Sequence, residues 1–334
     1  MRRAQIHGPG DVRLDEVPEP EVGPGDALLA VGACGICGSD VGYVRLGGLA
    51  GPVEEPMPLG HELAGTVIAV GSEVRDLPIG ARVALNPTVA GYAIGNGGPE
   101  GGFAPQLLVR DAGLGRNLFE IPNEMPFDVA ALAEPLGVGM NAVDRVSVQP
   151  GDKVAVLGAG PIGLAALATL LDRGIEDVIV VDRSSKRLEV ARKLGAPATL
   201  NAAEEELWEG IAERHGRVSF YGMPLVGTEV FIEATGARPL LEQLIDKARP
   251  GARISIVALH RETVPISFMT VMMKQLTLQG AMEYPERFEN MIELLTRRDL
   301  TPMITHRFSL DDFLEAFSLA RSPEAGAKIM IEIA

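Results

Sequence analysis

A cysteine, a histidine and two glutamates in the first 140 residues have the side-chain chemistry of a zinc site. They are Cys37, His61, Glu62 and Glu134. Thiolate, imidazole and carboxylate groups together form a zinc ligand set, and three protein ligands with an open position are typical of a catalytic site. The residue types alone leave other interpretations open. A free cysteine is commonly buried as a small hydrophobic residue, a lone histidine is usually structural, and Cys34 with Cys37 could be a redox pair.

A second group of residues, Gly158-Ala159-Gly160-Pro161-Ile162-Gly163, could bind the diphosphate of a dinucleotide. Gly158 would allow a tight turn, Gly160 would let the backbone approach the phosphates, and Gly163 would let a helix pack closely on a strand. The diphosphate would lie at a helix N-terminus, where free N–H groups favour negative charge and Pro161 is tolerated. A glycine turn that serves only close packing is the alternative.

The elements around this turn favour the dinucleotide interpretation. Residues 153–157 predict a buried parallel strand, residues 164–171 a helix, and residues 177–181 a second strand that ends at Asp182. The uncharged run from Val154 to Leu171 is therefore a strand, a turn and a helix, and we expect no membrane span. An acidic side chain at Asp182 binds ribose hydroxyls and repels a 2′-phosphate, so we expect NAD; Arg183 and Arg187 could weaken that preference.

Two later predicted strands, 229–233 and 253–258, should end near the nicotinamide half of the cofactor, because strand ends of a doubly wound sheet point at the cofactor crevice. Plain turns at the strand ends are the alternative. The candidate lining residues are Thr235, Gly236, Val257, Ala258 and Leu259.

Length and charge limit the class of protein. A chain of 334 residues predicts two domains. The 30 basic and 45 acidic residues give a net charge of −15, which disfavours nucleic acid and anionic membranes as partners. The N-terminus has no apolar segment typical of a signal peptide, and two cysteines form no disulfide framework. We therefore expect a cytoplasmic protein.

The order of the motifs resembles the zinc-dependent medium-chain alcohol dehydrogenases, particularly the branch with sorbitol (polyol) and threonine dehydrogenases. The similarity covers essentially the whole chain. Its segments are Cys37-Gly38-Ser39-Asp40, Gly60-His61-Glu62 with residues 63–71, Gly101-Gly102-Phe103-Ala104, Glu134-Pro135-Leu136, the glycine turn with Asp182, Phe308-Ser309-Leu310 and Glu315-Ala316-Phe317. The resemblance implies an α/β fold, in which a Rossmann doubly wound parallel sheet (141–282) is inserted into a β-rich GroES-like catalytic domain (1–140 and 283–334).

The resemblance also implies roles for the candidate zinc residues. Cys37 and His61 would be direct ligands, and Glu62 would be a carboxylate that ligates zinc or exchanges with water. Glu134 takes the position where other alcohol dehydrogenases have a second cysteine. Ser39 would hydrogen-bond the substrate hydroxyl and begin a proton relay. Asp40 would support the metal site, and Cys34, which matches no ligand, would be a core residue.

The activity implied is oxidation of a secondary alcohol to a ketone by NAD with one catalytic zinc. The substrate would be a small molecule, such as a polyol, sugar or cyclitol, and the enzyme would be a homo-oligomer, either a dimer or a tetramer. A zinc-free quinone or enoyl reductase and a non-catalytic NAD-binding relative are the alternatives. The candidate substrate-pocket residues are Tyr43, Phe103 and Val138.

The chain departs from the family pattern in two places. Residues 86–100 contain no cysteine, whereas many relatives hold a structural zinc there with four. We expect no structural zinc and a shortened lobe. Gly42 replaces a histidine that in many relatives passes the proton to solvent, so the relay has to end elsewhere.

Overall fold

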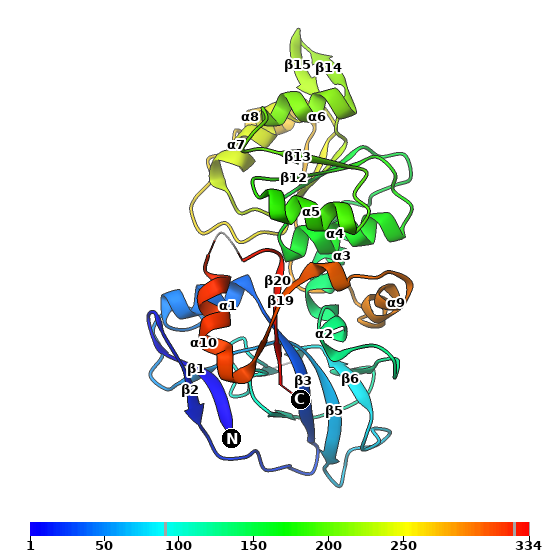
Figure 1. Ribbon diagram of the computed structural model, residues 1–334. Coiled ribbons are helices and arrows are strands. Elements are labelled where there is room, and N and C mark those ends of the chain that lie inside the picture. Colours follow the sequence, from blue (N-terminus) through cyan, green and yellow to red (C-terminus); the bar gives the residue numbers. More distant parts are fainter. Residues whose placement is uncertain (90–91, 323–324, 334) are drawn as a thin grey trace. The chain divides into compact units, whose positions relative to one another are not determined.

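The computed structural model describes residues 1–89, 92–322 and 325–333, and the chain forms two compact units (Figure 1). The first unit comprises Met1–Glu134, Arg287–Arg297 and Ile304–Ala334. The second comprises Pro135–Glu286 and Arg298–Met303. In the part of the chain that is described, no helix combines the length and the apolar character that a membrane crossing requires.

The second unit is built on a parallel sheet with helices on both faces. Its strands lie in the order β13-β12-β11-β16-β17-β18, and every neighbouring pair is parallel. Their bounds are β11 (Val154–Leu157), β12 (Val178–Asp182), β13 (Ala198–Asn201), β16 (Val230–Glu233), β17 (Arg253–Ile256) and β18 (Thr277–Gly280). Strand order reverses between β11 and β16, which is the switch point where doubly wound sheets bind ligands.

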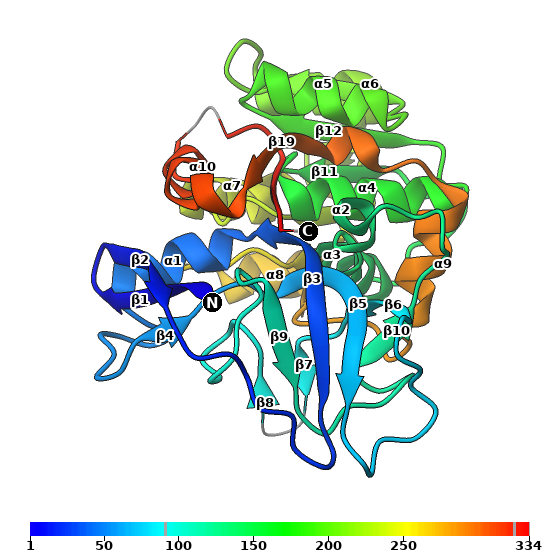
Figure 2. The ribbon, with the colours of Figure 1, turned by 60° about the horizontal axis from the view of Figure 1, so that its bottom comes forward.

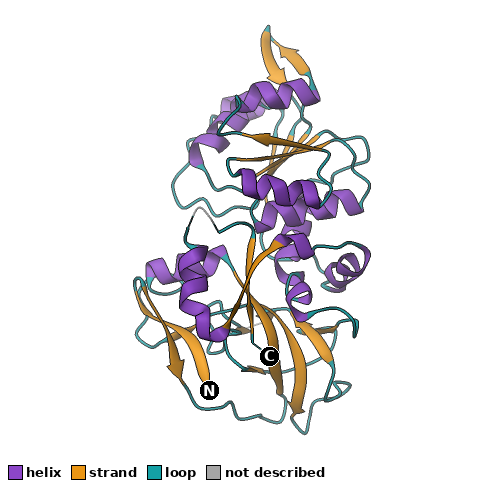
Figure 3. Cartoon of the chain, in the orientation of Figure 1, coloured by secondary structure: helices purple, strands orange, loops and turns teal. Residues whose placement is uncertain are grey.

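The helices of this unit divide between the two faces of the sheet. Figures 1 and 3 show α4 (Pro161–Asp172) and α5 (Ser185–Lys193) on one side, and α6 (Leu207–His215), α7 (Arg238–Lys247) and α8 (Phe268–Lys274) on the other. The chain enters this unit through α3 (Ala133–Arg145). A two-stranded hairpin, β14 (Arg217–Phe220) with β15 (Met223–Val226), projects beyond α6 (Figure 1).

The first unit is β-rich. Its larger sheet has the order β10-β6-β5-β3-β20-β19, and β9 also pairs with β3. The bounds are β3 (Ala27–Ile36), β5 (Glu62–Val70), β6 (Arg82–Leu85), β9 (Gln106–Val109), β10 (Leu118–Glu120), β19 (Ile304–Ser309) and β20 (Lys328–Glu332). Figure 2 shows β9, β3 and β5 side by side. A smaller sheet contains β1 (Arg2–Gly8), β2 (Asp11–Glu16) and β4 (Met57–Pro58).

Short helices and aliphatic side chains complete the first unit. The helices are α1 (Gly38–Leu46), α2 (Phe127–Ala130), α9 (Glu289–Arg297) and α10 (Phe313–Ala320), and η2 (Leu310–Asp312) is a 3₁₀ turn. A second 3₁₀ turn, η1 (Thr301–Met303), belongs to the second unit. A minor hairpin pairs β7 (Thr88–Val89) with β8 (Tyr92–Ala93). Because aromatic residues are scarce, the core is mainly Val, Ile, Leu and Ala, and the Phe103 and Phe313 rings meet within it at 5.0 Å.

Sheet register brings three strand ends together in the first unit. Gly35, near the end of β3, pairs with Glu62 at the start of β5. Ile36 at the end of β3 pairs with Ile329 near the start of β20. Residues near positions 37, 62 and 328, which are far apart in the sequence, therefore meet at one place. The parallel sheet and this β-rich unit confirm the predicted fold class.

Candidate functional site

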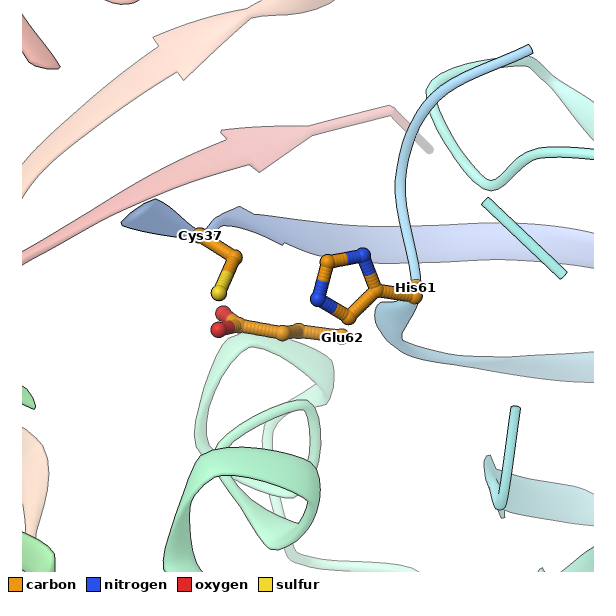
Figure 4. A group of neighbouring side chains, drawn as sticks. All are labelled: Cys37, His61 and Glu62. Atoms are coloured by element: carbon orange, nitrogen blue, oxygen red, sulfur yellow. The ribbon is translucent and has the colours of Figure 1, made fainter. Parts of the chain in front are cut away.

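The side chains of Cys37, His61 and Glu62 form a compact group. One ligand atom from each lies within 4.8 Å of the other two, and it is the only such group of three found among the described residues. Figure 4 shows the sulfur, the imidazole and the carboxylate facing a common point. Cys37 lies between β3 and α1, Glu62 is the first residue of β5, and His61 immediately precedes that strand. A soft thiolate, an imidazole and a carboxylate at this spacing fit a zinc ion.

Asp40 organises the metal-ligand candidates from the first turn of α1. Its Oδ2 accepts a hydrogen bond from the Cys37 backbone N–H at 2.8 Å, and Cys37 in turn caps the helix. Its Oδ1 lies 3.5 Å from Nδ1 of His61, and both atoms are buried without a hydrogen-bond partner in the described chain. Metal-binding histidines usually direct their second nitrogen at a carboxylate in this way, which leaves Nε2 for the ion.

The electrostatics of His61 agree with a cation site. Burial by itself lowers the pKa of His61, but Asp40 and Cys37 raise it well above the usual value. The negative surroundings that favour a proton on the imidazole also favour a divalent cation. The donor set and its negative surroundings therefore both fit zinc.

Glu62 has a partner that the sequence did not reveal. Nζ of Lys328 donates to its Oε1 at 2.6 Å and its Oε2 at 2.5 Å, and also to the carbonyl oxygen of Ile36 at 3.1 Å. Both side chains of the pair are 1% exposed. The carboxylate that completes the group with Cys37 and His61 is thus already paired with a buried ammonium group.

Glu134 lies at the first turn of α3 and is buried, but the described group of three does not include it. Burial by itself lowers the pKa of Lys328, and the charges of Glu62 and Cys37 raise it. The charge of Glu134 makes a smaller contribution that also raises this pKa. Glu134 is therefore near the same cluster.

Cys34 is fully buried, and burial raises the pKa of its thiol well above the usual value. This fits the core role expected for Cys34 better than a redox pair, and both cysteines are free.

Ser39 and Tyr43 extend the site along α1. The Ser39 hydroxyl oxygen lies 3.4 Å from Nε2 of His61. Tyr43 is half-buried, and its hydroxyl donates to Oδ1 of Asn96 at 3.1 Å. Burial raises the pKa of Tyr43, and the hydrogen bond with Ser39 acts in the opposite direction. Asn96 is a neighbour that the sequence did not identify.

The other two pocket candidates differ from Tyr43. Phe103 is 0% exposed and packs on Phe313, so its side chain belongs to the core and we do not retain it as a substrate contact. Val138 is half-buried in α3 of the second unit.

Residues 86–100 form a short hairpin and turn, of which Ala90 and Gly91 lie outside the described residues. A surface cavity of about 830 Å³ between residues 49–58 and 97–99 contains none of the candidate site residues.

The glycine turn has the geometry that a dinucleotide requires. Gly158 has a φ of +103°, a conformation that favours glycine. A Cβ on Gly163 would lie 1.8 Å from the Gly158 carbonyl oxygen, whereas one on Gly160 would meet no atom within 4 Å. Gly163 is thus needed for packing, and Gly160 leaves open space at the N-terminus of α4. Pro161 occupies the first turn of that helix, followed by Ile162.

Asp182 is held at the tip of β12. Its Oδ2 accepts from the Ala159 backbone N–H at 2.7 Å and its Oδ1 from the Ser184 backbone N–H at 2.8 Å. The carboxylate is therefore fixed beside the glycine turn. Arg183 is exposed, and Arg187 is half-buried in the first turns of α5, where the Ser184 side chain caps the helix.

The strand-end candidates also lie together. The loop after β16 carries Thr235 and Gly236, and the segment after β17 carries Val257, Ala258 and Leu259. Backbone N–H groups of Val257 and Ala258 donate to the Glu233 carbonyl oxygen at 3.0 and 3.2 Å. A Cβ on Gly158 would lie 3.0 Å from the Ala234 carbonyl oxygen. The glycine turn and both strand ends thus share one edge of the sheet.

Comparison with known proteins identifies the family of the chain. Residues 23–123 match the family model described as alcohol dehydrogenase GroES-like domain, and residues 161–297 match that described as zinc-binding dehydrogenase. Sorbitol dehydrogenase of Mus musculus is 34% identical over 348 aligned positions, which cover 98% of this chain and 94% of that protein. The Homo sapiens sorbitol dehydrogenase is 33% identical with the same coverage.

Solved structures give the same result. The 2R,3R-butanediol dehydrogenase from Bacillus subtilis superposes with a TM-score of 0.87 at 28% identity, covering 99% of each chain. Galactitol-1-phosphate dehydrogenase from Escherichia coli superposes with a TM-score of 0.84 at 27% identity, covering 99% of this chain and all of the other. The chain therefore belongs to the zinc-dependent medium-chain alcohol dehydrogenases, in the branch that includes the sorbitol dehydrogenases.

Proposed function

We propose that this zinc- and NAD-dependent alcohol oxidoreductase converts a secondary hydroxyl of a polyol, sugar or cyclitol into a ketone at the group formed by Cys37, His61 and Glu62. The observation that carries the proposal is the geometry of this group, in which one ligand atom from each of the three side chains lies within 4.8 Å of the other two. The likeness to sorbitol dehydrogenases supports the substrate class.

Cys37 and His61 are the direct metal ligands in this proposal. A bound zinc ion would supply Lewis acidity toward the substrate hydroxyl. Asp40 fixes both ligands, because one oxygen holds the backbone of Cys37 and the other faces the second nitrogen of His61. This arrangement orients the ligands before the metal arrives and so reduces the cost of organising the site.

The carboxylates have different parts in this proposal. Glu62 is held by Lys328, so it balances the charge of that buried ammonium group and approaches the metal only by leaving it. Glu134 is buried in the first turn of α3, and its charge acts on Lys328, so it is the other candidate for a further ligand, either directly or through water. Zinc content of Glu62→Gln and Glu134→Gln, measured in parallel, separates the two: the larger loss identifies the ligand.

In this proposal Ser39 receives the substrate proton. Its hydroxyl lies beside His61 Nε2, the nitrogen left for the ion, and it can accept from the substrate hydroxyl while it keeps its hydrogen bond with Tyr43. Gly42 offers no side chain to carry the proton further. The relay therefore continues through another hydroxyl or through water. Tyr43, fixed by Asn96, borders the substrate hydroxyls.

The NAD half of the proposal rests on the second unit. Gly160 leaves room for the diphosphate at the N-terminus of α4, and Asp182 accepts hydrogen bonds from the ribose. A nicotinamide cofactor held by these residues would supply the hydride acceptor for the carbinol carbon. Arg183 and Arg187 near Asp182 allow some binding of NADP, which a side-by-side titration of NADH and NADPH would measure.

Assembly and location belong to the same proposal. We propose a homo-oligomer, either a dimer or a tetramer, because α8 exposes Phe268, Met269 and Met272 by 76%, 67% and 67%. Light scattering at micromolar concentration tests this, and a monomer would contradict it. The two free cysteines, one of them a proposed ligand, favour the reducing cytoplasm.

Zinc analysis joined with cofactor binding is the decisive experiment. The wild type should carry about one zinc per subunit. Cys37→Ala should carry less than about 0.2 zinc per subunit, because a catalytic metal with few protein ligands needs each of them. Its NADH affinity should change by less than about twofold, because the proposed NAD residues lie in the second unit. Cys34→Ala is the matched control, since it removes the neighbouring thiol and should keep the metal. Asp182→Ala should show the reverse, weaker NADH binding with zinc retained.

The outcomes also separate the other functions. A wild type with less than about 0.2 zinc per subunit would favour a zinc-free reductase. A wild type that binds zinc and NADH but forms no NADH with any member of a broad polyol and secondary-alcohol panel would favour a non-catalytic relative. A loss of NADH affinity in Cys37→Ala as large as that in Asp182→Ala would contradict the assignment of separate sites.

A further inference from the structure

Glu233 is a buried carboxylate at the cofactor edge of the sheet that no step of the proposed reaction uses. It is the last residue of β16, where the register places it between Leu157 of β11 and Ile256 of β17. Its side chain is 0% exposed. A charge in this position is costly unless several donors satisfy it, so its partners show what it does.

The carboxylate bonds to both strand-end loops. Oε1 accepts from the backbone N–H groups of Thr235 and Gly236, at 2.8 and 3.1 Å, and from the Thr235 hydroxyl. Oε2 accepts from Nε2 of His260 at 2.8 Å. The first oxygen thus holds the loop after β16, and the second holds the segment after β17. Such charge-assisted hydrogen bonds are stronger than neutral ones.

The two loops also touch each other and the glycine turn. Gly236 has a φ of +68°, and a Cβ there would lie 3.0 Å from the Leu259 carbonyl oxygen. On the other side, the Ala234 carbonyl oxygen lies against Gly158. A rotation of either loop would therefore change the surface that continues from the diphosphate site toward the end of β17.

We propose that Glu233, together with His260, is a positioning pair that sets the binding surface for the nicotinamide half of NAD. This inference rests on the proposed function, because it takes Thr235, Gly236 and Val257 to Leu259 as the surface for that half. Glu233 does not contact the cofactor in this proposal. It acts through the loops, and His260 acts through Glu233, so the adenosine half, bound at Gly160 and Asp182, is independent of both.

Nδ1 of His260 supports a role beyond folding. This atom is buried and has no hydrogen-bond partner in the part of the chain that is described. A histidine kept only for packing could be replaced by an apolar side chain without leaving such an atom, since an unsatisfied buried polar group destabilises the fold. The other nitrogen of the same imidazole holds Glu233, and this charge-assisted hydrogen bond offsets the cost of the unpaired one.

The test compares a ligand that has the nicotinamide with one that lacks it. NADH affinity is measured by the fluorescence of the bound dihydronicotinamide, and ADP-ribose affinity by its displacement of NADH. In Glu233→Gln the shape is kept and the charge is lost, so the NADH Kd should rise about tenfold, which corresponds to about 1.4 kcal/mol. The ADP-ribose Kd should change by less than about twofold, which is within the error of such a displacement measurement.

Glu229→Gln is the matched control. Glu229 lies immediately before β16, at the opposite end of the same strand, and its carboxylate accepts from the Lys153 backbone N–H and from Arg249. This variant should leave the affinities for both ligands unchanged. If Glu233→Gln fails to fold, His260→Ala carries the test, and its NADH Kd should rise at least about threefold with ADP-ribose unaffected, because one charged hydrogen bond is lost.

Two results would overturn the inference. One is an NADH Kd within twofold of the wild type in the folded variant. The other is an equal loss of affinity for NADH and ADP-ribose, which would mean that Glu233 only stabilises the sheet. Because both measurements use binding, they remain valid if the wild type oxidises no alcohol, a result that would refute the proposed substrate class alone.

Discussion

Replacing Lys328 with methionine would remove the positive partner of the buried carboxylate at the candidate metal site. Nζ of Lys328 makes three hydrogen bonds, two to Glu62 and one to Ile36, from a side chain that is 1% exposed. Burial by itself lowers the pKa of Lys328, but Glu62 and Cys37 raise it above the usual value. The ammonium group is therefore charged at neutral pH.

The expected cost follows from the charge that remains. Methionine fills much of the same space, but the Glu62 carboxylate keeps its burial and loses its counter-charge. Breaking a buried ion pair in this way typically lowers the free energy of unfolding by about 3–5 kcal/mol. For a unit of this size each kcal/mol changes the Tm by about 2–4 °C. We therefore expect the Tm of the first unit to fall by about 6–20 °C.

Thermal unfolding followed by circular dichroism measures the loss, and hydrogen exchange of peptides from β5 and β20 localises it. Trp208, the single tryptophan, belongs to the second unit, so its fluorescence serves as an internal reference. Arg13→Met is the control, because Arg13 forms an exposed ion pair with Asp11 and its removal should cost less than about 1 kcal/mol. The double variant Glu62→Gln with Lys328→Met should be less destabilised than the sum of the two single variants.

A loss below about 1 kcal/mol in Lys328→Met, equal to that of an exposed pair, would refute the reasoning about burial. Additive losses in the double variant would refute the direct coupling of the two side chains, because contacting residues give interaction energies of about 0.5 kcal/mol or more.

Two further predictions concern the second unit. Gly160→Ala should keep the wild-type Tm and weaken NADH binding at least about tenfold, because a Cβ there meets only the open space proposed for the diphosphate. Gly163→Ala should lower the Tm, because its Cβ would strike the Gly158 carbonyl oxygen. Equal Tm losses in the two variants would contradict this reasoning. Burial lowers the pKa of His215 from 6.5 to about 4. Below pH 6.5 the unfolded chain binds the proton first, so stability present at neutral pH is lost as pH falls toward 4. Urea unfolding followed by Trp208 fluorescence should show about 2 kcal/mol less stability at pH 5 than at pH 7, and His215→Gln should remove most of this pH dependence. An unchanged pH dependence in His215→Gln would refute its assignment to His215.

Local patterns were sufficient for much of this protein. The turn from Gly158 to Gly163 could be interpreted residue by residue, because each glycine answers a requirement of nearby backbone, and the structure gives all three the expected surroundings. Asp182 follows from the length of one strand-helix-strand unit. The order of Cys37, His61 and the later motifs was enough to identify the family.

Other parts of the sites depend on contacts between distant residues. Lys328 lies 266 positions from Glu62 and reads in the sequence as an ordinary strand residue. Phe103 belongs to a family motif, yet its ring is buried against Phe313 and contributes to the core.

What the sequence by itself determined is the chemistry available: side chains that suit zinc, a glycine turn that suits a diphosphate and a carboxylate at a strand end that suits a ribose, since residue type and short spacing specify these. Only the tertiary structure decided how each charge is satisfied. It paired Glu62 with Lys328 and Glu233 with His260, because sheet register, which depends on the packing of whole strands, determines which distant side chains meet in the interior, where a charge needs a partner.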